Sequence, residues 1–160
     1  MSKLLDKLEK LNKGNPVPMG FGVSLARQKS AAILVIGILR SGHKKEANHL
    51  AKAKCDAAVL HTDRLDLTAV GEARTAIESV PWGAWLDRVT SEDLAKLRNE
   101  GCDFLVFQAG DVPMEALEEG EIARIMVVPV DMEDRLLRTL EDLPVDAILL
   151  RLGEQDSSPL

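Results

Sequence analysis

The chain has 160 residues, of which 46% are hydrophobic and 29% are charged, a balance that fits one folded domain and argues against disorder. Its formal net charge of −6 disfavours nucleic acid as a partner, because phosphate binding needs a basic surface stripe. No segment approaches the ~18 consecutive apolar residues of a membrane span, so no membrane partner is expected. Two cysteines are too few for a disulfide framework, and a cytoplasmic location is the default expectation.

The first 13 residues are predicted to form an amphipathic helix. Leu4, Leu8 and Leu11 recur at helical spacing and form one apolar stripe. The glycine and prolines of residues 14–18 end this helix. Residues 14–30 show no clear periodicity and are predicted to be irregular, and residues 153–160 are predicted to be a frayed tail.

Residues 31–152 alternate between apolar segments and helix-like segments, as βα repeats do. The best-bounded helix is predicted at 91–100, where Thr90 and Asp93 can form a capping box and Gly101 can provide a left-handed stop. Asp131 is expected to cap a helix at 132–143. Further helices are predicted at 43–54, 67–79 and 113–119, and strands at 32–39, 57–62, 82–87, 104–109, 125–131 and 147–152.

The predicted strands are apolar almost throughout, which is typical of a parallel sheet covered on both faces. No hairpin signal separates them, so right-handed helical crossovers are expected. The sequence therefore predicts a single α/β domain of six parallel strands.

A short motif repeats on every second predicted strand. A small residue, an aspartate and four apolar residues occur together three times, with the aspartates at Asp56, Asp103 and Asp146. The first two copies begin with Cys55 and Cys102, for which a packing role is expected. Each interval spans two strand–helix units, so the motif marks the second, fourth and sixth strands.

This repeat resembles the even strands of the (β/α)8, or TIM, barrel superfamily, especially its phosphate-handling group. The resemblance covers residues 31–152 and only six of the eight strands, whereas a complete barrel has ~250 residues. It implies a partial barrel whose open edges are closed by a second subunit, or a sequence that belongs to a longer chain. A homo-oligomer is therefore expected. An open doubly wound six-stranded sheet is the alternative.

Both folds place their sites at the carboxyl ends of the strands. The polar residues predicted there are candidates for a site that handles a small anionic molecule, with carboxylates and histidine as acid/base groups and arginines as anion clamps. The ordinary alternative is that they are helix caps and solvated strand ends. The candidate catalytic residues are His61, Asp63, Asp87 and Asp131, and the candidate substrate-binding residues are Arg40, Gln108 and Arg151.

His61 and Asp63 stand two positions apart on an extended end, so both can project to one side. This spacing is similar to that of ribulose-phosphate 3-epimerases, and the resemblance implies metal ligands or an acid/base pair; a divalent metal would then be the cofactor. The pattern departs from that family on the next strand, where Asp87 stands in place of a second histidine.

Two functions remain open from the sequence. The first is an enzyme that acts on a small anionic metabolite at the strand ends. The second is a non-catalytic binding or assembly module that uses its unpaired sheet edges. Neither a dinucleotide-binding glycine motif nor a Walker motif follows the first strand.

Overall fold

The computed structural model describes residues 2–13, 33–40, 44–77, 80–113, 117 and 121–151. The predicted irregular segment 14–30 and the predicted tail 153–160 lie outside these residues. Most of the predicted helix 113–119 also lies outside them. The described residues form one six-stranded parallel sheet. Its strands are β1 (Ile36–Arg40), β2 (Ala57–Thr62), β3 (Trp82–Leu86), β4 (Phe104–Gln108), β5 (Ala123–Pro129) and β6 (Ala147–Arg151).

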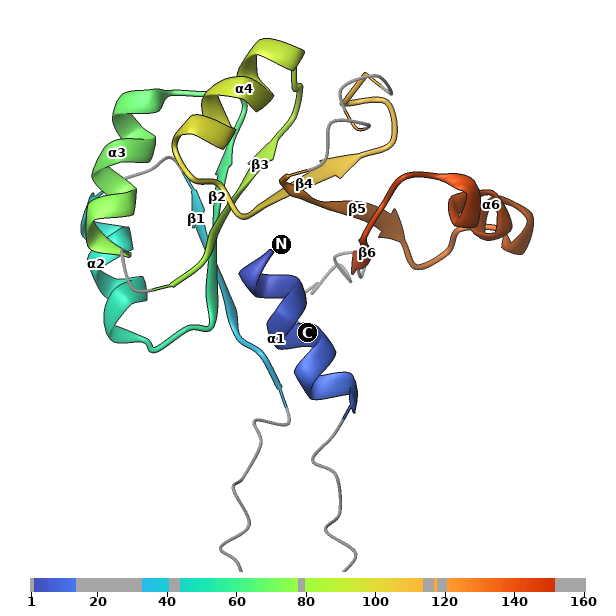
Figure 1. Cartoon of the computed structure of the whole chain (residues 1–160), viewed down its shortest axis with the longest axis horizontal. Coiled ribbons are helices and arrows are strands. Elements are labelled where there is room, and N and C mark those ends of the chain that lie inside the picture. Colours follow the sequence, from blue (N-terminus) through green and yellow to red (C-terminus); the bar gives the residue numbers. More distant parts are fainter. Residues whose placement is uncertain are drawn as a thin grey trace, which may run out of the picture.

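The order of the strands in the sheet follows their order in the chain, from β1 to β6, and every neighbouring pair is parallel. A doubly wound sheet reverses its strand order at a switch point, so the doubly wound alternative is wrong. Figure 1 shows that the sheet curls into a half-barrel. The predicted parallel sheet with helical crossovers is confirmed.

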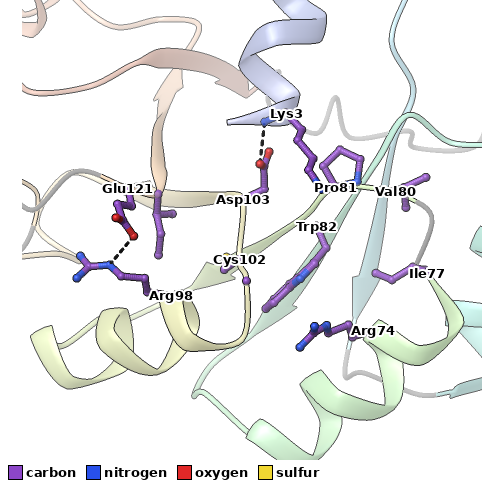
Figure 2. A pocket seen from close by; sticks show the side chains of 12 residues that line it. Lys3, Arg74, Ile77, Val80, Pro81, Trp82, Arg98, Cys102, Asp103 and Glu121 are labelled. Atoms are coloured by element: carbon purple, nitrogen blue, oxygen red, sulfur yellow. Dashed lines mark hydrogen bonds and ion pairs between the residues drawn. The ribbon is translucent and has the colours of Figure 1, made fainter. Parts of the chain in front are cut away.

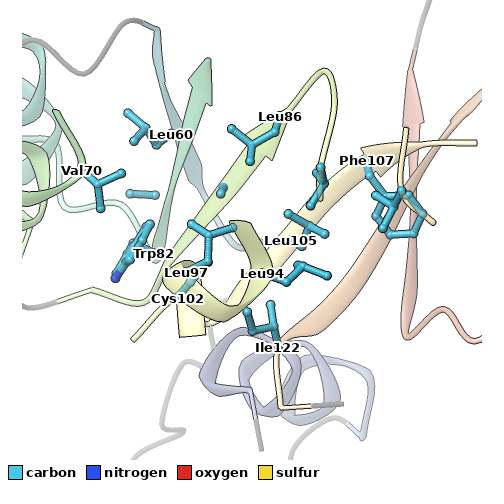
Figure 3. Close-up of a cluster of buried hydrophobic side chains, with 14 of the residues drawn as sticks. Leu60, Val70, Trp82, Leu86, Leu94, Leu97, Cys102, Leu105, Phe107 and Ile122 are labelled. Atoms are coloured by element: carbon cyan, nitrogen blue, oxygen red, sulfur yellow. The ribbon is translucent and has the colours of Figure 1, made fainter. Parts of the chain in front are cut away.

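Helices cover the convex face of the sheet. They are α2 (Lys44–Lys52), α3 (Leu67–Ala76), α4 (Ser91–Asn99) and α6 (Asp134–Thr139), which continues as the short 3-10 helix Leu140–Asp142. Figure 3 shows the core beneath them, where Leu97 of α4 packs near Leu86 and Leu105 of the sheet. Burial of this outer face is the main force that holds the βα units together.

The predicted capping of α4 is confirmed, because Thr90 and Asp93 form a capping box and Gly101 adopts a φ of 73°. The expected cap of the last helix is wrong. Asp131 lies before that helix, and Glu133 occupies the N-cap position without a side-chain hydrogen bond. The backbone of Glu133 is extended, with ψ at 139°, so the helix begins at Asp134, two residues later than expected.

The concave face of the half-barrel holds a second core and the N-terminal helix. Helix α1 (Lys3–Lys13) lies in the hollow of the curled sheet (Figure 1). Leu4 is fully buried there, in a cluster that includes Ala57, Phe104 and Ile125. Leu4 and the partly buried Leu5 therefore pack on the inside of the sheet, whereas Leu8 of the predicted apolar stripe is 36% exposed.

The repeated aspartates stand at the amino ends of β2, β4 and β6, opposite the expected site. Asp56 Oδ2 accepts the backbone N–H of Val35 at 3.0 Å, and Asp146 Oδ2 accepts that of Arg124 at 2.8 Å. Each carboxylate thus ties the start of an even strand to the preceding strand. Asp103 has the same place on β4, but its carboxylate turns to α1. The repeat is therefore a structural device.

The two edge strands, β1 and β6, each pair with one neighbour only within the described sheet. Ile38 on β1 is 51% exposed, and Ile148 and Leu150 on β6 are 47% and 63% exposed. Among the described residues, no exposed large hydrophobic side chain belongs to β2, β3, β4 or β5. No described helix is long and apolar enough to cross a membrane.

Candidate functional site

Side-chain alternation along the strands decides which candidates face the hollow. Ala57 and Val59 of β2 belong to the concave core, so His61 is on the same face at the carboxyl end of that strand. The same reasoning places Arg40, Gln108 and Arg151 on the concave side of β1, β4 and β6. These four positions therefore share the concave face at the carboxyl ends of their strands.

His61 contacts the side chains of two residues of the neighbouring β3 region. Its Nε2 lies 3.7 Å from Oδ1 of Asp87, which directly follows β3. Its ring stacks on Trp85 with 4.7 Å between centroids and 35° between planes. Arg40 is its register partner on β1. We call Arg40, His61, Trp85 and Asp87 the carboxyl-end cluster.

The cluster is open to solvent on one side and buried on the other. The side chains of His61 and Asp87 are 31% and 56% exposed. Trp85 packs against the concave core, and its Nε1 is buried without an acceptor among the described residues. An unmet buried donor is costly, so this N–H is suited to a ligand that supplies an oxygen.

Trp85 is the functional candidate that the sequence-based reasoning missed. The three-residue spacing of Trp82 and Trp85 predicts opposite faces of a strand, and the structure places them in different cores. The sequence signal that could have identified Trp85 is its position two residues before Asp87, on the concave face.

The other candidates do not join the cluster. Asp63 and Asp131 are exposed in the loops after β2 and β5. The backbone of Gln108 forms a turn with Asp111. The Gln108 N–H donates to Asp111 Oδ2 at 3.1 Å, and the Gln108 carbonyl accepts the backbone N–H of Asp111. Arg151 is exposed at the edge of the sheet, with Pro129 as its register partner. No hydrogen bond or ion pair links these side chains to His61 within the described ranges.

A metal site is not formed by these residues. Across the described part of the chain, no three His, Cys, Asp or Glu side chains come close enough to hold a metal ion. His61 and Asp63, the metal ligands or acid/base pair that the epimerase resemblance implied, therefore belong to no such group of three among the described residues.

A pocket of about 440 Å³ lies at the opposite end of the sheet, where β3 and β4 begin (Figure 2). We call it the amino-end pocket. It contains none of the seven predicted site residues. Cys102 lies in its wall, and burial raises the pKa of this thiol to about 12. Its Sγ donates to the carbonyl of Phe104 at 3.2 Å, as expected for a packing cysteine rather than a nucleophile.

No known protein-family model matches this chain. No curated protein matches it either. Among solved structures, the half-barrel is similar to the carboxyl transferase domain of pyruvate carboxylase from Rhizobium etli, solved with oxamate and biotin. The TM-score is 0.55 at 14% identity, and the match covers 73% of this chain and 27% of that one. The likeness is one of fold.

Proposed function

We propose that the chain is a TIM-barrel-like protein that binds a small carboxylate- or phosphate-bearing molecule at the carboxyl-end cluster and transfers a proton there. The observation that carries this proposal is the contact of His61 with Asp87, between neighbouring strands and beside the buried Trp85 indole. Histidine beside a carboxylate is a recurring arrangement for general acid/base chemistry. The half-barrel fold supports the location, because such folds use the carboxyl ends of their strands.

Each member of the cluster has a distinct role in this proposal. Asp87 faces Nε2 of His61, which orients the imidazole and leaves Nδ1 to exchange a proton with the bound molecule. Trp85 offers a flat wall and an indole N–H for an oxygen of the ligand. Arg40, beside His61 in the sheet, supplies positive charge for the anion.

Calorimetric titration with oxamate and with inorganic phosphate tests the proposal and separates the two anion types. Oxamate is a natural probe because the carboxyl transferase domain with a similar fold was solved with it. We expect saturable binding of one of them, weakened at least about tenfold by His61→Ala and by Asp87→Ala. His49→Ala is the matched control, because His49 is exposed on α2 away from the cluster. An affinity that is the same in His61→Ala and Asp87→Ala as in the wild type would overturn the proposal.

The second candidate function is assembly through the sheet edges. It is favoured by the exposed Ile38, Ile148 and Leu150 on strands that lack an outer partner in the described sheet. We expect a homo-oligomer by size-exclusion chromatography with light scattering, and dissociation in Leu150→Lys. Leu67→Lys, on an exposed residue at the start of α3, is the control. A wild-type monomer at high micromolar concentration would contradict this candidate.

Cytoplasmic location stays a prediction.

A further inference from the structure

The net charge of the chain changes sign from one edge of the sheet to the other. Residues 1–80 contain 13 Lys and Arg against 8 Asp and Glu, a net charge of +5. Residues 81–160 contain 7 Lys and Arg against 18 Asp and Glu, a net charge of −11. Because the strands lie in chain order, the basic half of the chain carries the β1 edge and the acidic half carries the β6 edge.

The segments that contain the two outermost helices carry the same difference. Figure 1 shows α2 and α6 at opposite ends of the outer helix layer. Residues 44–54 have four lysines and one glutamate, and Lys52 and Lys54 are exposed. Residues 131–142 have five Asp and Glu and two arginines, and Glu133 and Asp142 are exposed. The net charges of the two segments are therefore +3 and −3.

We propose that a second copy of this chain completes the half-barrel, so that β6 of each copy lies parallel to β1 of the other. This inference rests on the second candidate function, assembly through the sheet edges, and it specifies which edges meet. A two-fold axis along the strand direction relates the two contacts, and the closed ring leaves no strand edge open.

Electrostatics favours this arrangement over the pairing of like edges. Contact between two β1 edges would bring two basic α2 segments together, and contact between two β6 edges would bring two acidic α6 segments together. Like charges placed across an interface oppose association, whereas opposite charges speed the encounter and fix the orientation of the partners. Pairing of β6 with β1 brings segments of opposite charge to the same side of each contact.

Apolar side chains at the edges fit this contact on both faces of the sheet. Ile38 of β1 lies on the concave face, because its register partner Val59 belongs to the concave core. Leu150 of β6 lies on the convex face, because its register partner Val128 belongs to the outer core. Neighbouring strands place side chains of the same face side by side. The exposed fractions of Ile38 and Leu150, 51% and 63%, would both fall in the ring.

Closure of the ring would also cover the hollow of the sheet. Helix α1 lies in this hollow, and its Leu8 side chain is 36% exposed (Figure 1). The outer edges of β1 and β6 have no neighbouring strand within the described sheet, so their backbone groups can pair with a further strand.

Size-exclusion chromatography with light scattering should give the mass of two copies. Ile38→Lys and Leu150→Lys should each weaken this dimer at least about tenfold, because every contact needs one edge of each kind. Leu67→Lys, at the start of α3, is the control and should leave the dimer unchanged. All three side chains are exposed, and circular dichroism verifies that each variant is folded.

The salt dependence of the dimer tests the charge argument. Raising the NaCl concentration from about 50 to about 500 mM should weaken the dimer severalfold, because salt screens the attraction between opposite charges. A dimer built from two acidic edges would instead become tighter, because salt would screen the repulsion between them.

Cross-linking identifies the strands that meet. Ile38→Cys on β1 and Arg151→Cys on β6 both place a thiol on the concave face, and the native Cys55 and Cys102 are buried. A short bismaleimide should link the copies in a mixture of the two variants and link neither variant with itself. Wild type treated with the same reagent is the control for the native thiols.

The possible results separate this inference from the function on which it rests. A wild-type monomer at high micromolar concentration would overturn both. A dimer that resists either lysine substitution, becomes tighter in salt or is cross-linked in one cysteine variant alone would overturn only the pairing of β6 with β1.

Discussion

Ser2 donates a 2.8 Å hydrogen bond from its hydroxyl to Oδ2 of Asp103, a residue 101 positions further along the chain. The same carboxylate receives two backbone N–H groups at the start of α1. Asp103 therefore caps a helix from outside that helix, and its charge complements the positive end of the helix dipole. This contact and the burial of Leu4 hold α1 in the hollow of the half-barrel.

Replacing Asp103 with alanine should lower the free energy of unfolding by about 1 to 2 kcal/mol, the usual loss when a helix cap is removed. Urea denaturation followed by circular dichroism measures this change. Asp142→Ala is the control, because Asp142 is exposed in the 3-10 helix. Equal stability of the two variants would show that Asp103 does not anchor α1.

Gly83 is required by close packing of β3 on β4. A Cβ atom at this position would meet the ring of Phe104 and lie 2.5 Å from its backbone oxygen, and neither can move freely. Gly83→Ala should therefore destabilise the fold by about 1 to 3 kcal/mol or more. Differential scanning calorimetry would show the loss as a lower Tm.

Gly71 provides the matched control for this substitution. It lies inside α3, and a Cβ there has nothing within 4 Å. Gly71→Ala should raise stability by about 0.5 to 1 kcal/mol through helix propensity. The packing argument fails if both alanines change the Tm in the same direction.

Arg124 and Asp146 should make the fold sensitive to acid. The Arg124 guanidinium donates from Nε at 2.9 Å and lowers the pKa of the Asp146 carboxyl. A lowered pKa stabilises the fold above the ordinary carboxyl value near 4, and the effect is lost as pH falls through the folded-state value. Asp146→Asn should thus cost about 1 to 2 kcal/mol near neutral pH.

The difference between wild type and Asp146→Asn should shrink as the pH falls below about 4. Urea unfolding at a series of pH values measures it, with Asp142→Asn as the exposed control. A difference that stays constant over the acid range would mean that the carboxylate charge is not what stabilises this contact.

Much of the fold could be predicted from local sequence, because periodicity and caps act over a few residues. The strand predicted at 57–62 is observed as Ala57–Thr62, and Thr90 caps α4 as its sequence pattern indicates. Asp131 shows the limit of this reasoning. Two acidic residues precede the last helix, and only the backbone conformation of Glu133 decides where the helix begins.

The candidate site was predictable only where the pleat of the sheet fixes side-chain direction. His61 and Asp87 come together because parallel strands β2 and β3 bring their carboxyl ends to one edge. Among the described residues Asp87 contacts His61 and Asp63 does not, although each directly follows its strand, so alternation alone does not decide which of them reaches His61. The apolar stripe of α1 indicated a buried face, but its partner on the concave sheet is a long-range contact that local patterns do not encode.

The indole resonance of Trp85 tests the central claim most directly, because its buried N–H has no acceptor among the described residues and its ring contacts that of His61. In ¹H–¹⁵N spectra assigned with Trp82→Phe, titration with oxamate or inorganic phosphate should shift this resonance and leave that of Trp82 in place. The shift should disappear in Asp87→Ala. A Trp85 resonance unmoved by either anion would contradict the assignment of a ligand site to the carboxyl-end cluster.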